Sequence, residues 1–211
     1  MRLSELGSAI YLQALSSSKN AADTILKHLN RQPSDSETFK LQFCLTVPFL
    51  LCAAKATMSC QSLTEAQKVR VMDHAIDAYF ADLRLDDPKD FVHLDDFLAH
   101  QSERATFLAQ LPSAIRQSSE SGASLKTSLH DIATSVFQKR FSEYQNLWND
   151  DISRSNTPNF FPLLGRKVYS HWTGQEATNP EVFMFSFDLW TELLVFLRTA
   201  RQVLDSINIT A

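Results

Sequence analysis

The amino-acid sequence predicts an all-α fold, a single-domain bundle of six to seven helices over residues 1–211 around a buried, Pro-kinked central helix. Three observations support this prediction. The chain has four glycines among 211 residues, so tight turns and hairpins are scarce. Long stretches repeat apolar residues every three to four positions, as in an amphipathic helix. Alternating strand patterns do not exceed about four residues.

The stretch from Ser34 to Cys60 is the predicted central helix. Ser34 and Glu37 form an S-x-x-E capping box that defines its start. The 14 residues from Leu41 to Ala54 carry no charge, as expected for a helix that other helices surround. Pro48 in its middle predicts a kink or a break. A membrane span is the alternative, but the uncharged run is shorter than the roughly 18 to 20 residues that a spanning helix needs.

The other helices are predicted from apolar periodicity and from their capping residues. Before the central helix, residues 3–30 form one long helix, or two that join weakly at the serines 16–18. After it, Ser62 and Glu65 form a second capping box, which starts a helix at Leu63. The last helix is rich in Phe, Leu and Trp, and we expect it to pack beside the central one. The helices predicted after the central one cover residues 63–84, 87–110, 125–149 and 180–207.

Residues 150–179 are predicted to be irregular, because they hold two prolines and two glycines and show no clean period. The segment combines aromatic with basic residues, which can hold a phosphate, a nucleotide or an acidic partner. Arginine and aromatic side chains also dominate the energetics of protein interfaces. The structural alternative is a loop whose aromatics plug the end of the bundle. The predicted partner-binding residues are Arg166, Lys167, Tyr169, His171 and Trp172.

A second candidate site lies in the acidic stretch from Asp82 to Glu103. Helical spacing places two imidazoles and two carboxylates on one face there, and these groups are good ligands for a divalent transition metal. A metal site in a helical bundle normally collects its ligands from several helices, and the sequence holds no Glu-x-x-His motif. The prediction is therefore a solvated charged face, without a bound metal or other cofactor. The weak candidate ligands are Asp90, His93, Asp96 and His100.

Acidic residues also occur on the predicted last helix. Asp188 and Glu192 are four positions apart, where like charges repel unless a cation lies nearby. They could form an acidic site. The prediction that we favour places them on a solvent-facing stripe together with Ser186, Thr191 and Thr199.

The charge, the first 20 residues and the cysteine spacing argue against several classes of protein. The net charge of −4 and the pI of about 5.8 do not favour nucleic-acid binding. The first 20 residues lack the apolar core of a signal peptide. The spacing of Cys44, Cys52 and Cys60 fits neither a disulfide within one helix nor a zinc site, so reduced thiols of a cytoplasmic protein are expected.

Recognised catalytic motifs are absent from the sequence, including the phosphate-binding glycine loops, H-E-x-x-H and G-x-S-x-G. The predicted function is a non-catalytic cytoplasmic protein-binding module of the immunity, antitoxin, adaptor or secretion-chaperone type. It would dock a protein partner through the aromatic and basic segment, and it could also form a homodimer. The alternative is a helical-bundle enzyme or small-ligand-binding protein with an apolar pocket between helices edged by His and Asp. Neither nucleic acid nor a membrane is an expected partner.

Overall fold

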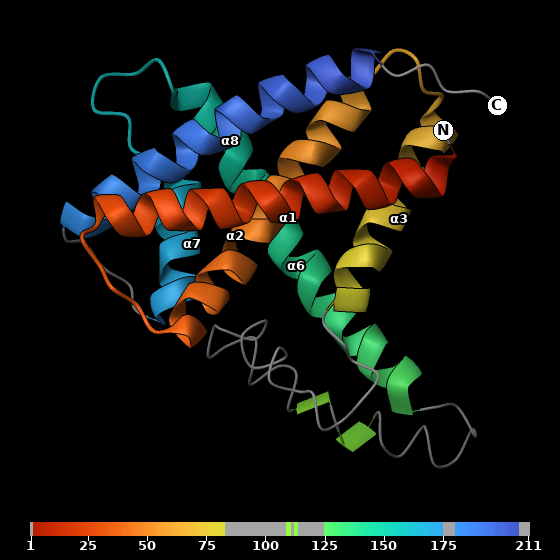
Figure 1. The fold of residues 1–211 in the computed structure, drawn as a ribbon, viewed down its shortest axis with the longest axis horizontal. Coiled ribbons are helices and arrows are strands. Elements are labelled where there is room, and N and C mark those ends of the chain that lie inside the picture. Colours follow the sequence, from red (N-terminus) through yellow and green to blue (C-terminus); the bar gives the residue numbers. More distant parts are fainter. Residues whose placement is uncertain (1, 83–108, 111, 114–124, 175–179, 207–211) are drawn as a thin grey trace.

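The computed structural model describes residues 2–82, 109–110, 112–113, 125–174 and 180–206, and these residues form a compact bundle of helices without a strand. Figure 1 shows α1 lying across the other helices, and α8 runs in the direction opposite to α1. The prediction of an all-α bundle with a central helix is confirmed. The described helices are α1 (Leu3–His28), α2 (Asp35–Ser59), α3 (Glu65–Asp82), α6 (Leu125–Arg154), α7 (Leu163–Thr173) and α8 (Pro180–Ser206).

Helix α2 forms the centre of the bundle. It contacts all five of the other helices named above, and every residue from 43 to 53 is buried. The predicted capping box is present, since the N–H of Glu37 donates to Ser34 Oγ and the N–H of Ser34 donates to Glu37 Oε2. The helix continues through Pro48, which is consistent with a kink and excludes a break.

Within the described residues, one helical stretch, Glu37–Ser59, is long and apolar enough to cross a membrane by length and composition. In its most apolar window, 78% of the residues are buried inside the bundle. The core helix of a soluble protein meets the same criterion of length and composition, so this stretch is weak evidence for a span.

Helix α1 is one continuous helix that packs on α2 and α3, and it continues through the serines at 16–18. Ser18 is buried there, where its hydroxyl donates to the carbonyl of Leu15 and lies 3.0 Å from the hydroxyl of Thr46 on α2. Gly7 allows the close approach of α3, because a Cβ at this position would lie 2.5 Å from His74 Cβ.

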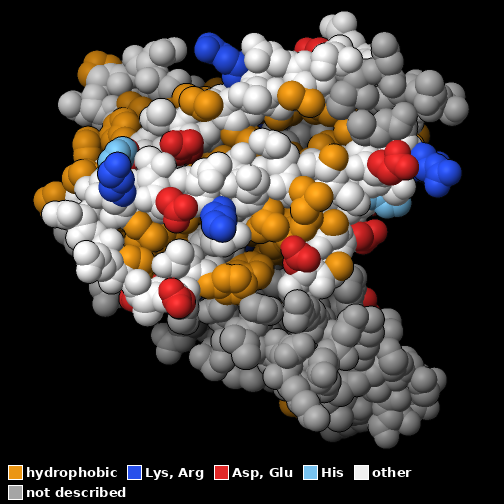
Figure 2. All heavy atoms as spheres, in the orientation of Figure 1, with side chains coloured by type: hydrophobic (Ala, Val, Ile, Leu, Met, Phe, Trp, Pro, Cys, Tyr) orange, Lys and Arg blue, Asp and Glu red, His pale blue; other side chains and the backbone are white. Residues whose placement is uncertain are grey.

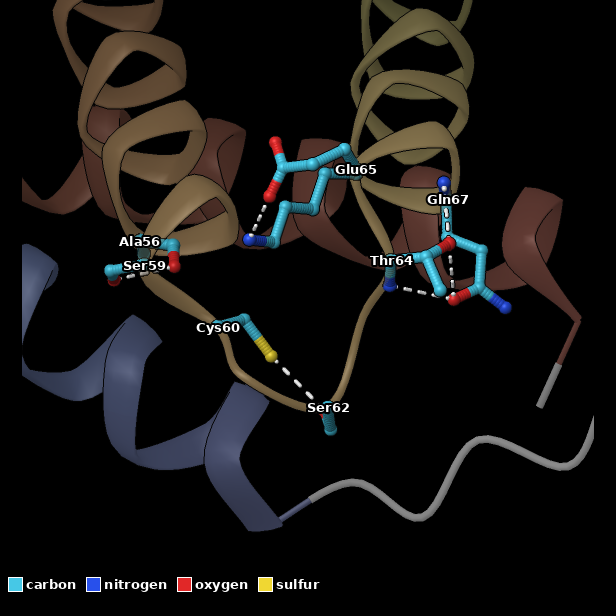
Figure 3. Close-up of polar contacts among 8 residues, drawn as sticks. Ala56, Ser59, Cys60, Ser62, Thr64, Glu65 and Gln67 are labelled. Carbon is cyan, nitrogen blue, oxygen red and sulfur yellow. Dashed lines mark hydrogen bonds and ion pairs between the residues drawn. The ribbon is translucent and has the colours of Figure 1, made fainter.

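The start of α3 differs from the prediction. The predicted capping box of Ser62 and Glu65 does not form, and the box consists of Thr64 and Gln67 instead (Figure 3). The N–H of Thr64 donates to Gln67 Oε1 at 2.9 Å, and the N–H of Gln67 donates to Thr64 Oγ1 at 3.4 Å. Ser62 instead contacts Cys60 Sγ at 3.1 Å, and Glu65 pairs with Lys68. Two overlapping capping patterns were therefore present, and the second one starts the helix.

The prediction of an irregular segment over residues 150–179 is wrong for more than half of its described part. Helix α6 continues to Arg154, and α7 occupies residues 163–173. Asp151 on α6 fixes the start of α7, because its carboxylate accepts the backbone N–H groups of Leu163 and Leu164 at 2.8 and 2.9 Å. Burial raises the pKa of Asp151, and these two hydrogen bonds partly offset the rise.

Helix α7 lies against both α6 and α8. Gly165 permits this close packing, since a Cβ there would lie 2.5 Å from the Cα of Ser186 on α8. Ser186 is consequently buried, which corrects its predicted place on a solvent-facing stripe. Its hydroxyl donates to the carbonyl of Val182 at 2.6 Å. At the other end of α7, Gly174 adopts a left-handed conformation with φ of 71°, which glycine tolerates best.

Candidate functional site

Three of the five predicted partner-binding residues lie inside the bundle. Tyr169, His171 and Trp172 are all buried on α7. The Trp172 ring stacks on Phe185 of α8 with centroids 5.8 Å apart, and the Tyr169 ring meets the same phenylalanine edge-on at 5.3 Å. Nδ1 of His171 and the hydroxyl of Tyr144 on α6 share a hydrogen bond of 2.5 Å. These three side chains are buried, as expected if the aromatic residues of this segment plug the bundle. They join α7 to α6 and α8.

The two predicted basic residues are more accessible. Arg166 is exposed on α7, and Lys167 is half-buried and forms an ion pair of 2.9 Å with Glu143 of α6. The local positive charge is therefore partly neutralised. The aromatic and basic residues of the predicted site do not form one exposed surface, because most of the aromatic ones point into the core.

The weak candidate metal ligands Asp90, His93, Asp96 and His100 lie outside the described residues. Among the residues that the structure describes, no group of three or more His, Cys, Asp or Glu side chains is arranged to hold a metal ion.

The two acidic residues Asp188 and Glu192 on α8 have different surroundings. Asp188 lies 3.0 Å from Nδ1 of His28, at the end of α1, so the two helices are joined there. Glu192 is half-buried, and Thr191 and Thr199 are exposed as expected. Asp188 therefore marks the edge of α8 that meets α1.

A cluster of aromatic side chains lies where the chain enters α7. Phe160 and Phe161 precede the helix and are half-buried against α8. The Phe161 ring stacks on Phe183 at 5.6 Å and an angle of 12°, and Phe160 meets Phe187 edge-on at 6.3 Å. Phe183 keeps 54% of its surface exposed. The partly exposed aromatic side chains of this region are therefore those at residues 160, 161, 183 and 187. They lie before α7 and on α8, outside the predicted site at residues 166–172.

This aromatic cluster continues as an apolar strip along α8, which we call the α8 outer face. Figure 2 shows hydrophobic side chains at the surface along α8, from the left edge of the molecule to the top. Met184, Leu194 and Val195 are 46%, 39% and 58% exposed. The α8 outer face comprises Phe183, Met184, Phe187, Thr191, Leu194 and Val195.

The spacing of this face follows the heptad rule. Met184, Phe187, Thr191 and Leu194 follow one another at steps of three, four and three residues, which places them on one line along the helix. Arg198 and Arg201 continue the line at steps of four and three, and both are exposed. Neither arginine has an ion-pair partner among the described residues. The α8 outer face is thus followed along the same line of the helix by two positive charges.

Searches against protein-family models, curated proteins and solved structures gave no match.

Proposed function

We propose that this protein is a non-catalytic, cytoplasmic protein-binding module, and that its α8 outer face docks an amphipathic helix of a partner protein. The observation that carries this proposal is the row of large, exposed hydrophobic side chains on α8 beside the Phe160–Phe161 pair. Large apolar side chains that stay exposed together on one face of a helix are typical of interaction sites in soluble proteins.

The energetics favour a protein partner over simple exposure to water. Covering apolar surface contributes about 25 cal/mol per Å². Phenylalanine and methionine are enriched in the cores of interfaces, where aromatic side chains supply much of the binding energy. Phe183 and Phe187 are already held in place by Phe161 and Phe160, so little side-chain freedom remains to be lost on binding.

The shape and charge of the face define the partner. A line of residues with heptad spacing matches the apolar stripe of another helix, as in helix-in-groove and coiled-coil recognition. Arg198 and Arg201 at the end of this line favour carboxylates on the partner. The expected partner is therefore a helix with an apolar stripe whose acidic end lies over these two arginines. The free, buried thiols Cys44, Cys52 and Cys60 support a reducing compartment.

The test uses two matched valine substitutions. Val195→Glu places a charge in the α8 outer face, where the side chain is 58% exposed. Val69→Glu makes the same change on α3, where Val69 is 50% exposed. A photo-crosslinking amino acid at Thr191 then identifies the partner and the segment that touches α8, with the same amino acid at position 69 as control.

The proposal predicts a crosslink from position 191 to an amphipathic, acidic helix of another protein. Val195→Glu should abolish the crosslink, Val69→Glu should preserve it, and Arg198→Glu with Arg201→Glu should weaken it. A different result would be a crosslink from position 191 to a second copy of this chain, together with a dimer in sedimentation experiments that Val195→Glu disrupts. That result would mean that the α8 outer face mediates self-association in place of partner binding. Binding to anionic lipid vesicles that depends on Val195 would instead identify a membrane surface. If Val195→Glu leaves every interaction intact, the docking function does not reside on α8.

A further inference from the structure

A cavity of about 350 Å³ lies between α1, α2 and the end of α3. Its size is at the lower end for pockets that hold small molecules. Leu15, Phe39 and Phe43 form its apolar wall, and the two phenylalanine rings meet edge-on at 4.9 Å. Polar residues from all three helices also line this cavity. Imperfect packing alone would leave a cavity but would not explain why polar residues line it.

The ionisable groups of this cavity give it negative charge. Asp82, the last residue of α3, is exposed, and its carboxylate accepts a hydrogen bond of 2.5 Å from the hydroxyl of Tyr11. Burial and the nearby Asp82 raise the pKa of Tyr11, so the phenol keeps its proton and acts as the donor. Among the described residues, Asp82 has no ion-pair partner, and the described part of the lining contains no Lys, Arg or His.

The neutral polar groups add hydrogen-bond acceptors. The hydroxyl of Thr46 has one hydrogen, which it can donate to the backbone carbonyl of Gln42 at 2.8 Å. Ser18 can likewise donate to the carbonyl of Leu15 at 2.8 Å. The two hydroxyls also lie 3.0 Å apart, so one of them can donate to the other instead. In each of these arrangements the Thr46 oxygen keeps at least one lone pair that can accept a hydrogen bond. Gln42 also lines the cavity, and its side-chain amide offers an oxygen acceptor together with an NH2 donor. The second carboxylate oxygen of Asp82 is a further acceptor.

We propose that this cavity binds a primary ammonium group carried on a small apolar body. The ammonium ion offers three N–H donors and a positive charge, which suit a site with acceptors and one carboxylate. Its apolar body packs on Leu15, Phe39 and Phe43, and phenylalanine rings also attract cations. This site shares no residue with the α8 outer face, so the proposal does not depend on the docking function.

Three probes of similar size test the charge requirement. Phenethylammonium carries the proposed cation, 2-phenylethanol replaces it by a neutral hydroxyl, and phenylacetate replaces it by an anion. Ligand-observed NMR titrations of the wild-type protein should show saturable binding of phenethylammonium that weakens with added salt. The alcohol should bind about tenfold or more weakly, because a charge-assisted hydrogen bond is about twice as strong as a neutral one and one decade of affinity is about 1.4 kcal/mol. Phenylacetate should not bind.

Two matched variants test the residue that we assign. Asp82→Asn should weaken phenethylammonium binding about tenfold or more, while Asp77→Asn, at an exposed acid on the same helix, should leave it unchanged. Val195→Glu should also leave it unchanged, which separates this site from the docking surface. Melting temperatures of all variants report folding.

Equal affinity for the ammonium and the alcohol would overturn the proposal and leave an apolar pocket. No saturable binding of phenethylammonium to the wild-type protein would remove the site altogether. Equal losses in Asp82→Asn and Asp77→Asn would show that the acidic surface attracts the probe without a specific site. Because the series of probes uses the wild-type protein, it decides the charge requirement even if Asp82→Asn unfolds.

Discussion

Helices α2 and α8 are both rich in large apolar residues, but they differ in how they are covered. Helix α2 is surrounded by α1, α3, α6, α7 and α8, and its residues 43–53 are all buried. Helix α8 buries one face, with Phe185, Leu189 and Leu193 among its buried residues, and exposes Phe183, Met184 and Val195 on the other. The apolar content of a helix therefore predicts that it will be covered, but not whether the cover belongs to the same chain.

The largest expected effect contrasts leucines on these two helices. Leu50→Ala on α2 should reduce the free energy of unfolding by about 2 to 5 kcal/mol, because it removes a fully buried side chain and leaves a cavity. Leu194→Ala on the outer face of α8 should cost less than about 1 kcal/mol, because that side chain is 39% exposed and its site can relax into solvent. Denaturant unfolding measures both values. A cost for Leu50→Ala below about 0.5 kcal/mol would remove α2 from the core.

The next effect concerns the inner face of α8, where α7 packs. Gly165→Ala should cost about 1 to 3 kcal/mol, because the added methyl group would meet the backbone of Ser186, which cannot move without shifting α8. Gln202→Ala, on an exposed position of α8, serves as the control and should change stability by less than about 0.5 kcal/mol. Thermal and denaturant unfolding compare the two variants. Wild-type stability in Gly165→Ala would contradict the close packing of α7 on α8.

Much of this fold could be predicted from local signals. The capping box of Ser34 and Glu37 and the uncharged run after it located α2 correctly, because both signals act within one helix. The start of α3 was misplaced, since Ser62/Glu65 and Thr64/Gln67 both match a capping pattern and only their geometry distinguishes them. The sequence alone therefore does not distinguish between two overlapping caps.

The candidate site was harder to predict. Helix α7 has only 11 residues and contains Gly165, so its period was hidden by the prolines and glycines around it. The four-residue spacing of Leu164, Val168 and Trp172, all buried, could have revealed it. The α8 outer face could not be found from sequence, because the apolar residues of α8 extend well beyond the face that it buries. Only the arrangement of the other helices shows which of them remain exposed.

A smaller effect tests how α7 is held in place beside α8. Asp151→Ala should cost about 1 kcal/mol, because the carboxylate caps the first turn of α7. Its pKa is raised in the folded protein, so the native state keeps the proton over a range of pH in which the unfolded chain has lost it. Stability contributed by this group should therefore fall as pH rises from about 4, the ordinary aspartate pKa, through the raised native value.

Denaturant unfolding of the wild type and of Asp151→Asn over this pH range isolates the contribution of Asp151. The stability of the wild type relative to the asparagine variant should decrease with rising pH and then level off. A relative stability that increases with pH would mean that the hydrogen bonds from Leu163 and Leu164 outweigh burial, and that the native pKa is lowered.

The smallest expected effect on stability is also the one that decides the contrast between α2 and α8. Val195→Glu should change the free energy of unfolding by less than about 0.5 kcal/mol, because the side chain is 58% exposed and a glutamate there remains in water. Val69→Glu on α3 should behave alike. If both variants keep wild-type stability, a loss of partner binding in Val195→Glu alone must arise at the interface and not from unfolding. A cost of about 2 kcal/mol or more for Val195→Glu, but not for Val69→Glu, would mean that the native protein covers this face itself, as expected for a buried charge. The outer face of α8 would then be part of the core, as α2 is, and the partner would have to bind elsewhere.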